Sequence, residues 1–361
     1  MTHLPHLLVD ISGHGFGHLA QLVPVLERLS QKAPFRLTVR TDLPEPLLRR
    51  RLTVPFRLER GALDVGMAMV DAVTVDPEAS RRRYLAFHAD YGKRLEGEKQ
   101  RLRTLRPDLL LSNIPYLSIE AAAEVGIPSV ALCSLNWAEI LRGYFADDPD
   151  LLPIIQRIGR AYRSADLFLL PEPSVPMALP NLRPIGPIAK KGRDRGEEIR
   201  KRLGLPPETR LALIALGGIP AAFAFERWPR REGLIWLLPP AIESDRADAL
   251  PFQKLPLPFH DLIASSDLVV TKIGYGTLTE AVVHGKPILS VLRPGWAETE
   301  PLSRWCSARG RFVGIEPERL SAGDFEEALE RLLAMPPKPP VEPTGVEEAA
   351  EVVAEKLLNR P

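Results

Sequence analysis

Residues 268–283 read LVVTKIGYGTLTEAVV, and this stretch indicates the fold most directly. Its first three residues, Leu268-Val269-Val270, form a short apolar run that is typical of a buried strand. A turn with two glycines follows, and then a helical pattern. The same order occurs at the start of the chain, where an apolar run at 7–11 precedes Ser12-Gly13 and a helical pattern over 19–29. Repeated strands and helices in this order predict an α/β protein with parallel sheets and helices on both faces.

The alternation continues along the chain with one interruption, because six prolines fall within residues 171–188. We interpret this stretch as a stiff linker. The expected domains are an N-terminal Rossmann-like domain over 1–170 and a C-terminal Rossmann-like domain over 189–335. Residues 336–361 are expected to form a proline-rich segment and a last helix, which could cross back onto the first domain. Such doubly wound domains face each other across a cleft at the carboxyl ends of their strands. The other expected elements are strands at 35–39, 109–111, 129–132, 166–170, 211–216, 234–238 and 287–292, and helices at 84–105, 119–125, 261–265 and 345–358.

Composition argues against several classes of protein. Lys and Arg number 47 and Asp and Glu 46, so the formal net charge of +1 gives no excess of positive charge for binding nucleic acid. Charged residues at 26% and hydrophobic residues at 45% are ordinary for a globular protein. Cys133 and Cys306 form neither a disulfide framework nor a CxxC pair, and we predict no metal site. Without a membrane-spanning stretch or a signal peptide, a cytoplasmic protein is expected.

The turn after the first strand reads Ser12-Gly13-His14-Gly15-Phe16-Gly17-His18. Its glycines let the backbone approach a ligand closely, and the helix that follows contributes N–H groups and a positive dipole end. The spacing differs from the dinucleotide pattern G-x-G-x-x-G. His18 is our candidate general base and His14 a weaker one, since imidazole titrates near neutral pH. The alternative is that the glycines make only a tight connection.

The turn within residues 268–283 is suited to a diphosphate. Backbone N–H groups and a hydroxyl at the start of a helix bind phosphate oxygens, and Lys272 would add positive charge. Glu280 lies about one turn into the helix, where its carboxylate could accept two ribose hydroxyls. The alternative is an ordinary helix residue at Glu280 and a solvated charge at Lys272. The residues assigned to the diphosphate are Gly274, Tyr275, Gly276, Thr277, Lys272, Gly217 and Gly218.

A further motif, Trp296-Ala297-Glu298-Thr299-Glu300-Pro301, follows the strand expected at 287–292. Its carboxylates could hydrogen-bond sugar hydroxyls, and Trp296 could stack on a sugar face. Without other support, such a stretch is more often an exposed loop.

Together these motifs resemble the glycosyltransferase-like amino-terminal half of plant L-arabinokinases. More distantly, the sequence is similar to the peptidoglycan N-acetylglucosaminyltransferase, a GT-B enzyme with two facing Rossmann-like domains. The resemblance spans most of residues 7–330, and the motifs that carry it are Ser12–His18, Asp71–Asp76, Leu135-Asn136-Trp137, Gly217-Gly218, Lys272–Pro287 and Glu300-Pro301.

The resemblance implies that the C-terminal domain binds a nucleotide sugar and the N-terminal domain an acceptor. It places the ribose at Glu280 and the reacting centre near His18. Thr299 and Glu300 stand where the peptidoglycan enzyme has the glutamine pair that reads the donor sugar, so we assign them to the donor sugar without naming it. Only the glycosyltransferase-like half of arabinokinases is matched, so no kinase activity is implied. The residues assigned to the acceptor cleft are Gly15, Gly17, Asp76, Asn136 and Trp137.

The sequence therefore predicts a metal-independent GT-B glycosyltransferase. The donor would be a nucleoside-diphosphate sugar, with UDP as the expected nucleotide, and the acceptor a hydroxyl of a small molecule or glycan. No cofactor is expected beside this substrate. Two alternatives stay open: a nucleotide-sugar epimerase or hydrolase of the same fold, and a non-catalytic nucleotide-sugar sensor.

Overall fold

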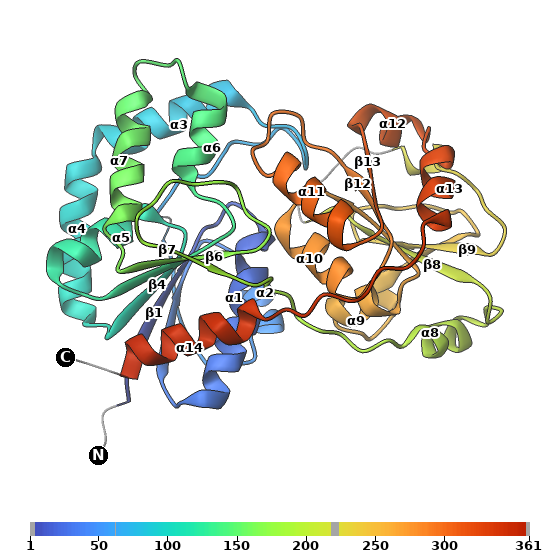
Figure 1. Cartoon of the computed structure of the whole chain (residues 1–361), viewed down its shortest axis with the longest axis horizontal. Coiled ribbons are helices and arrows are strands. Elements are labelled where there is room, and N and C mark those ends of the chain that lie inside the picture. The colour runs from blue at the N-terminus through green and yellow to red at the C-terminus, as the bar shows by residue number, and fades with distance from the viewer. Residues whose placement is uncertain (1–3, 62, 218–223, 359–361) are drawn as a thin grey trace. The chain divides into compact units, whose positions relative to one another are not determined.

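A computed structural model describes residues 4–61, 63–217 and 224–358 of the chain. The chain forms two compact units, which can be followed in Figure 1. Unit 1 combines the chain up to Ala68 with Val75–Ile188 and with the chain from Pro343 onward. Unit 2 combines Met69–Thr74 with Ala189–Glu342. Each unit is therefore assembled from stretches that are separate in the sequence.

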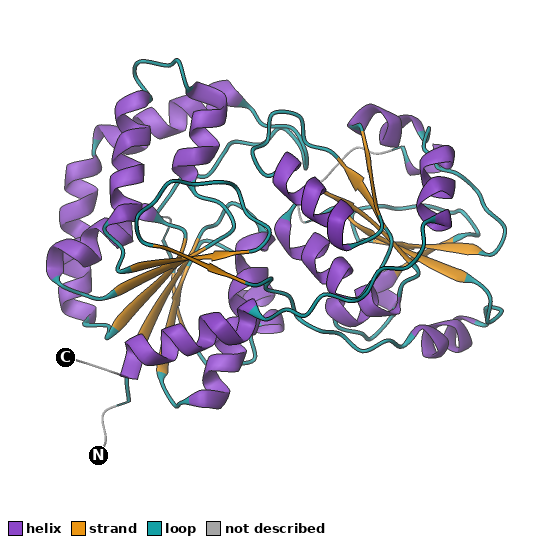
Figure 2. Ribbon diagram, in the orientation of Figure 1, coloured by secondary structure: helices purple, strands orange, loops and turns teal. Residues whose placement is uncertain are grey.

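Unit 1 is built on a parallel sheet with helices on both sides (Figure 2). Within the described residues the sheet has seven strands in the order β3-β2-β1-β4-β5-β6-β7. Its central strands are buried along their whole length, as expected for parallel strands covered on both faces. The strands are β1 His6–Ile11, β2 Arg36–Arg40, β3 Arg57–Glu59, β4 Leu109–Asn113, β5 Ser129–Leu132, β6 Leu167–Pro171 and β7 Leu182–Ile185. The helices are α1 Phe16–Lys32, α2 Glu45–Arg51, α3 Pro77–Ala89, α4 Tyr91–Leu105, α5 Tyr116–Val125, α6 Trp137–Phe145, α7 Leu152–Arg163 and α14 Gly345–Leu358.

Unit 2 repeats this architecture with six parallel strands among the described residues, in the order β10-β9-β8-β11-β12-β13. Its core includes the buried rings of Trp228, Trp236 and Phe325. The strands are β8 Arg210–Ala215, β9 Leu234–Leu238, β10 Ala249–Pro251, β11 Leu268–Lys272, β12 Ile288–Val291 and β13 Phe312–Ile315. The helices are α8 Gly196–Leu203, α9 Phe259–Ser265, α10 Tyr275–Val283, α11 Thr299–Arg309, α12 Pro317–Ala322 and α13 Glu326–Ala334, with 3₁₀ turns at Phe225–Arg227 and Phe252–Lys254.

The predicted fold class, two doubly wound parallel-sheet units, is confirmed. Two local expectations differ from the structure. The helix expected over 84–105 is two helices, because the backbone at Asp90 leaves the helical conformation between α3 and α4. Residues 171–188 are more than a linker, since they contain β7. Pro184 is tolerated there because β7 is an edge strand, where a missing N–H breaks no central ladder.

Two segments pack far from their sequence neighbours. Residues 69–74 belong to unit 2, where Val73 joins the hydrophobic core. Helix α14 belongs to unit 1 and packs along α1, where Glu347 forms ion pairs with Arg28 and Lys32 (Figure 1). In the part of the chain that the structure describes, none of the helices combines the length and the apolar character needed to cross a bilayer.

Candidate functional site

His18 lies in a chain of buried amide hydrogen bonds at the carboxyl ends of β1 and β4. Its Nδ1 is 2.7 Å from Oδ1 of Asn113, the last residue of β4. Nδ2 of Asn113 donates to Oε1 of Gln21 over 3.1 Å, and Nε2 of Gln21 donates to the hydroxyl of Ser134 over 2.9 Å. The sheet brings these groups together because Ile11 pairs with Asn113, so the turn after β1 begins beside that amide.

This chain of bonds fixes the tautomer of His18. Because Nδ2 of Asn113 donates to Gln21, Oδ1 of Asn113 faces the imidazole, and an amide oxygen can only accept. Nδ1 of His18 therefore carries the hydrogen and Nε2 keeps its lone pair. A lone pair on Nε2 is what a general base needs.

Burial keeps His18 neutral. The residue is 6% exposed, and burial lowers its pKa to about 4, although the hydrogen bond to Asn113 acts in the opposite direction. Its partner is an uncharged amide, which orients the ring without the attraction that a carboxylate would exert on an imidazolium. His18 is consequently unprotonated over the neutral pH range.

The indole of Trp137 lies against both histidines of the turn. Its ring centroid is 5.9 Å from that of His18 and 5.1 Å from that of His14. Trp137 is fully buried, and its Nε1 donates to Oδ2 of Asp64 over 2.7 Å. Burial raises the pKa of Asp64 to about 6, against the hydrogen bonds from Trp137 and Ser12. The hydrogen bond between Trp137 and Asp64 therefore fixes the indole against which the two imidazoles lie.

His14 is held in a different way from His18. Its Nδ1 accepts a hydrogen bond from the backbone N–H of Met67 over 3.3 Å. A Cβ at Gly66 would come within 2.7 Å of the same nitrogen, and the φ of +58° at Gly66 also favours glycine. With Nδ1 of the neutral ring accepting, the hydrogen lies on Nε2. This geometry favours His18 over His14 as the base.

The other residues assigned to the acceptor cleft have local structural partners. Asp76 caps α3 and Asn136 caps α6, each through a side-chain oxygen that accepts a first-turn N–H. Trp137 is fully buried. A Cβ on Gly15 or Gly17 would meet no atom within 4 Å, so the space around this part of the turn is open.

In unit 2, three of the predicted donor-site features meet at one edge of the sheet. Strand β11 ends at Lys272, and α10 begins at Tyr275 with Gly274 as its N-cap and no capping side chain. A Cβ at Gly217, just after β8, would lie 3.3 Å from Cε of Lys272. Gly276 lies in the first turn of α10. A helix N-terminus next to a lysine concentrates positive charge at this edge.

Lys272 is half-buried in a mixed charged environment. Burial lowers its pKa to about 7, and the nearby guanidinium of Arg293 acts in the same direction. Glu298 and Asp71 oppose these effects by favouring the charged ammonium. At neutral pH Lys272 is therefore poised between its charged and neutral forms.

Most of the motif after β12 is buried or half-buried, and Glu300 is its exposed member. Arg293 is 4% exposed, and its guanidinium carbon lies 3.9 Å from the centroid of the Trp296 ring. Nε1 of Trp296 donates to Oε2 of Glu298 over 2.9 Å, and both residues are buried. The interpretation of this stretch as an exposed loop is wrong. Stacking of a sugar on Trp296 is also not supported, because the ring is buried under Arg293.

Of the two residues assigned to the donor sugar, Thr299 donates its hydroxyl to the carbonyl of Arg293 over 2.7 Å. Glu300 is exposed on the first turn of α11, where it forms an ion pair with Arg304. The buried carboxylate of this motif is Glu298. Glu280 is half-buried on α10, and its carbonyl oxygen lies 2.7 Å from Nδ1 of His284. Gly218, assigned to the diphosphate, lies outside the described residues.

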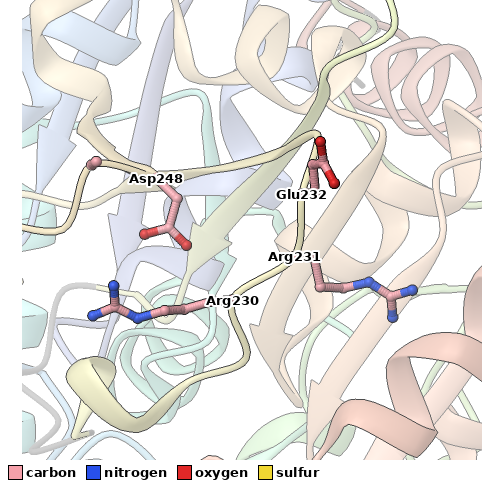
Figure 3. Close-up of a pocket in the computed structure, with 5 residues that line it drawn as sticks. Arg230, Arg231, Glu232 and Asp248 are labelled. Atoms are coloured by element: carbon pink, nitrogen blue, oxygen red, sulfur yellow. The ribbon is translucent and has the colours of Figure 1, made fainter.

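A surface hollow of about 260 Å³ on unit 2 lies away from this edge. It is lined by charged side chains that include Arg230, Arg231, Glu232 and Asp248 (Figure 3). These residues precede β9 and β10, so the hollow is at the amino ends of the strands. Lys272 is at the carboxyl end of β11, which runs parallel to these strands in the same sheet. The hollow is therefore separate from the predicted diphosphate site.

Sequence reasoning missed four residues that shape these two regions: Asn113, Gln21, Asp64 and Arg293. Asn113 ends an expected strand, which is a position that faces ligands in parallel sheets, so a signal for it was present. Gln21 sits between the apolar positions of α1, and Asp64 lies outside every motif. Their roles depend on partners 92 and 73 residues away.

No family model matches the chain. Among curated proteins, the L-arabinokinase of Arabidopsis thaliana is 27% identical over 357 residues, which cover 97% of this chain and 34% of that protein. The chain thus spans about a third of that relative. The uncharacterized glycosyltransferase MK0977 of Methanopyrus kandleri is 25% identical over 73% of this chain and 80% of its own length. The UDP-N-acetylglucosamine–N-acetylmuramyl-(pentapeptide) pyrophosphoryl-undecaprenol N-acetylglucosamine transferase of Thermus thermophilus is 30% identical over 270 residues, 64% of this chain and 68% of that enzyme.

Solved structures with the same fold include the calicheamicin glycosyltransferase CalG4, with a TM-score of 0.59 at 15% identity over 98% of this chain and 94% of that one. A UDP-glucosyltransferase from Polygonum tinctorium aligns over the whole of both chains with a TM-score of 0.60 at 15% identity. UGT89C1 of Arabidopsis thaliana, solved in complex with UDP, has a TM-score of 0.58 at 15% identity over 98% of this chain and the whole of that one.

Proposed function

The chain belongs to the GT-B glycosyltransferases, and we propose that it transfers a sugar from a UDP-linked donor to an acceptor hydroxyl without using a metal ion. The observation that carries the proposal is the edge of the unit 2 sheet where the N-terminus of α10 and Lys272 lie together. UDP is favoured as the nucleotide because UGT89C1, which has the same fold, was solved with UDP bound.

The donor diphosphate would bind at this edge. Phosphate oxygens would accept hydrogen bonds from backbone N–H groups around Gly276 and Thr277, and Lys272 would add a charge-assisted bond. Glu280, further along α10, would hold the ribose hydroxyls. Negative charge grows on the leaving diphosphate during transfer, so preorganised positive groups here stabilise the transition state. The helix end and the lysine would take the part that a divalent cation plays in other transferases, and this supports metal independence.

His18 would act as the general base. Its Nε2 lone pair, fixed by the bond between Nδ1 and Asn113, would take the proton of the acceptor hydroxyl. The acceptor oxygen would then form a bond to the anomeric carbon, while the bond between that carbon and the diphosphate oxygen breaks. The products are the glycosylated acceptor and UDP, with the proton on His18.

A thermal-shift screen with UDP, GDP, ADP and dTDP and their sugar conjugates tests the donor class, because a ligand of the folded state raises the melting temperature in proportion to ln(1 + [L]/Kd). We expect UDP and UDP sugars to give the largest shifts. Glu280→Ala should reduce the shift for every nucleotide sugar, while Glu327→Ala, an exposed position on α13 outside the assigned site residues, serves as the control. Equal shifts for wild type and Glu280→Ala would remove Glu280 from the ribose site.

Incubating the protein with labelled UDP sugars in the absence of an acceptor tests the reaction type. A transferase should turn over the donor slowly under these conditions. Rapid release of UDP or rapid inversion of a sugar carbon would contradict transfer in favour of a hydrolase or an epimerase.

A further inference from the structure

Residues 69–74, which we call the insert loop, come from the N-terminal half of the sequence but are built into unit 2. Two contacts anchor this loop. Val73 is 7% exposed and packs in the core of unit 2, in the same cluster as Leu216 and Val270. The thioether sulfur of Met69 lies 3.9 Å from Nη2 of Arg293. Leu216 and Val270 lie near the carboxyl ends of β8 and β11, so the loop is fixed at the donor edge of the sheet.

The insert loop presents its carboxylate in a fixed orientation. Oδ1 of Asp71 accepts the backbone N–H groups of Val73 and Thr74 over 2.8 and 2.9 Å. Oδ2 accepts the hydroxyl of Thr74 over 3.1 Å, and the N–H of Val70 closes the turn on the carbonyl of Thr74. A carboxylate has about four acceptor sites, so these three bonds do not saturate it. Asp71 is therefore a positioned negative charge that can still accept a further donor.

The charged groups that act on Lys272 come from two segments of the chain. Arg293 and Glu298 lie on the segment between β12 and α11, and Asp71 lies on the insert loop. Gly217, on the side of β8, carries no charge. Arg293 disfavours the ammonium, whereas Glu298 and Asp71 favour it. Glu298 also accepts the indole N–H of Trp296, which leaves Asp71 as the acid delivered by a separate segment of the chain.

We propose that the insert loop is part of the donor site and that Asp71, whose carboxylate is fixed by its turn at the carboxyl edge of the unit 2 sheet, is a positioning residue for Lys272. This inference rests on the proposed function, because it takes Lys272 as the cation for the diphosphate. It adds a residue from the N-terminal half of the chain to a site that the sequence assigns to the C-terminal half.

Lys272 needs such a residue because its amine is close to the midpoint of its titration at neutral pH. Burial and Arg293 hold the pKa of Lys272 at about 7, so a small change in its surroundings changes the charged fraction strongly. Only the ammonium form makes charge-assisted bonds to phosphate oxygens. Removal of Asp71 should therefore lower the pH at which Lys272 loses its proton, and UDP binding should weaken first at high pH.

The test is UDP binding by isothermal titration calorimetry from pH 6 to pH 9. Wild-type affinity should fall as the pH rises through about 7. Asp71→Asn keeps an oxygen for the turn but removes the charge, and we expect it to shift the midpoint down by about half a unit, which weakens binding about threefold at pH 7.5 and hardly at all at pH 6. Lys272→Met, measured in parallel, records the pH dependence that comes from UDP itself.

Three further variants separate charge from structure. Thr74→Val removes the bond to Oδ2 of Asp71 but keeps the charge, and Glu78→Gln removes an exposed carboxylate nearby in the sequence, on α3. Both should keep the wild-type midpoint. Asp71→Ser, which retains a turn-forming oxygen, should reproduce the shift if Asp71→Asn fails to fold.

The outcomes distinguish this inference from the proposed function. A wild-type midpoint in both Asp71 variants would overturn the role of Asp71 and leave the donor site intact. A midpoint shifted equally in Thr74→Val would mean that the turn, not the charge, matters, and would also overturn it. If Lys272→Met binds UDP as tightly as wild type at every pH, the proposed diphosphate site itself is wrong.

Discussion

The turn after β1 and the turn after β11 have the same construction and opposite electrostatics. Each joins the end of a central parallel strand to the N-terminus of a helix through glycines. In the first turn the key side chain, His18, is hydrogen-bonded to the neutral amide of Asn113 and stays uncharged. In the second, Lys272 stands among Arg293, Glu298 and Asp71. The same strand–turn–helix backbone is therefore used at both places, once around a neutral imidazole and once around a lysine. The polar side chains around each turn determine its charge.

The largest effect should come from His18→Ala, which removes the proton acceptor of the neutral turn. Transfer should fall by at least about a hundredfold, because general-base catalysis contributes roughly 10²- to 10⁴-fold. UDP affinity should be unchanged, since His18 and Lys272 belong to different units. Steady-state kinetics and calorimetry measure the two quantities separately. His14→Ala is the matched control and should lose less activity; a loss as large as that of His18→Ala would reverse the order of the two histidines.

Lys272→Met should give the reverse pattern, in which binding is lost. A hydrogen bond to a charged group contributes about 1.5–3 kcal/mol, so UDP should bind about 10- to 150-fold more weakly. Calorimetry at pH 6.5, where the lysine of the wild type is mostly charged, gives the largest contrast. The distinction between the two turns fails if this variant loses transfer without any change in UDP affinity.

Asn113→Asp would make the first turn resemble the second by placing a negative charge next to Nδ1 of His18. The pKa of His18 is about 4 in the wild type, so transfer at saturating donor should not lose its base until the pH approaches that value. An adjacent carboxylate should raise this pKa by about 1–3 units. The acidic limb of the rate profile should move to higher pH by the same amount. Identical limbs in the two proteins would show that the amide does not control the titration of His18.

The smallest effect is expected for Asp64→Asn, which removes a buried carboxylate that is hydrogen-bonded to Trp137 and Ser12 beside the first turn. Asn can still accept the indole N–H of Trp137, which Asp64 binds over 2.7 Å. We expect transfer within about threefold of wild type at pH 7.5 and a change in unfolding free energy of less than about 1 kcal/mol, since a neutral acceptor replaces a charged one without leaving an unpaired donor. Denaturant unfolding and initial rates check both. A severe loss of activity would show that the first turn does need a charge.

The parts of the molecule that follow from local sequence could be predicted well. Apolar runs such as 268–270 and the glycines after them specify strand, turn and helix within a few residues of one another. The edge strand β3 was missed because Arg57–Glu59 is short and mostly polar, and β7 because prolines usually mark loops.

The polar partners at the site could not be predicted from local patterns. Asn113 reaches His18 only because β4 pairs with β1 in one particular register. Whether Glu298 or Glu300 points inward depends on where α11 begins: Glu298 is the N-cap residue and Glu300 lies on the exposed side of the first turn. Asp71 and Arg293 lie 222 positions apart, and the folding of the insert loop into unit 2 brings them to Lys272.

The insert loop also limits how this protein can be recombined with its relatives. A chimera that swaps in a foreign 189–342 to change donor preference would keep the resident Val73, which packs in the core of the exchanged part. Such a graft would carry one mismatched hydrophobic position and one mismatched acid, Asp71. An exchange of unit 2 therefore has to replace residues 189–342 and the six residues 69–74 together.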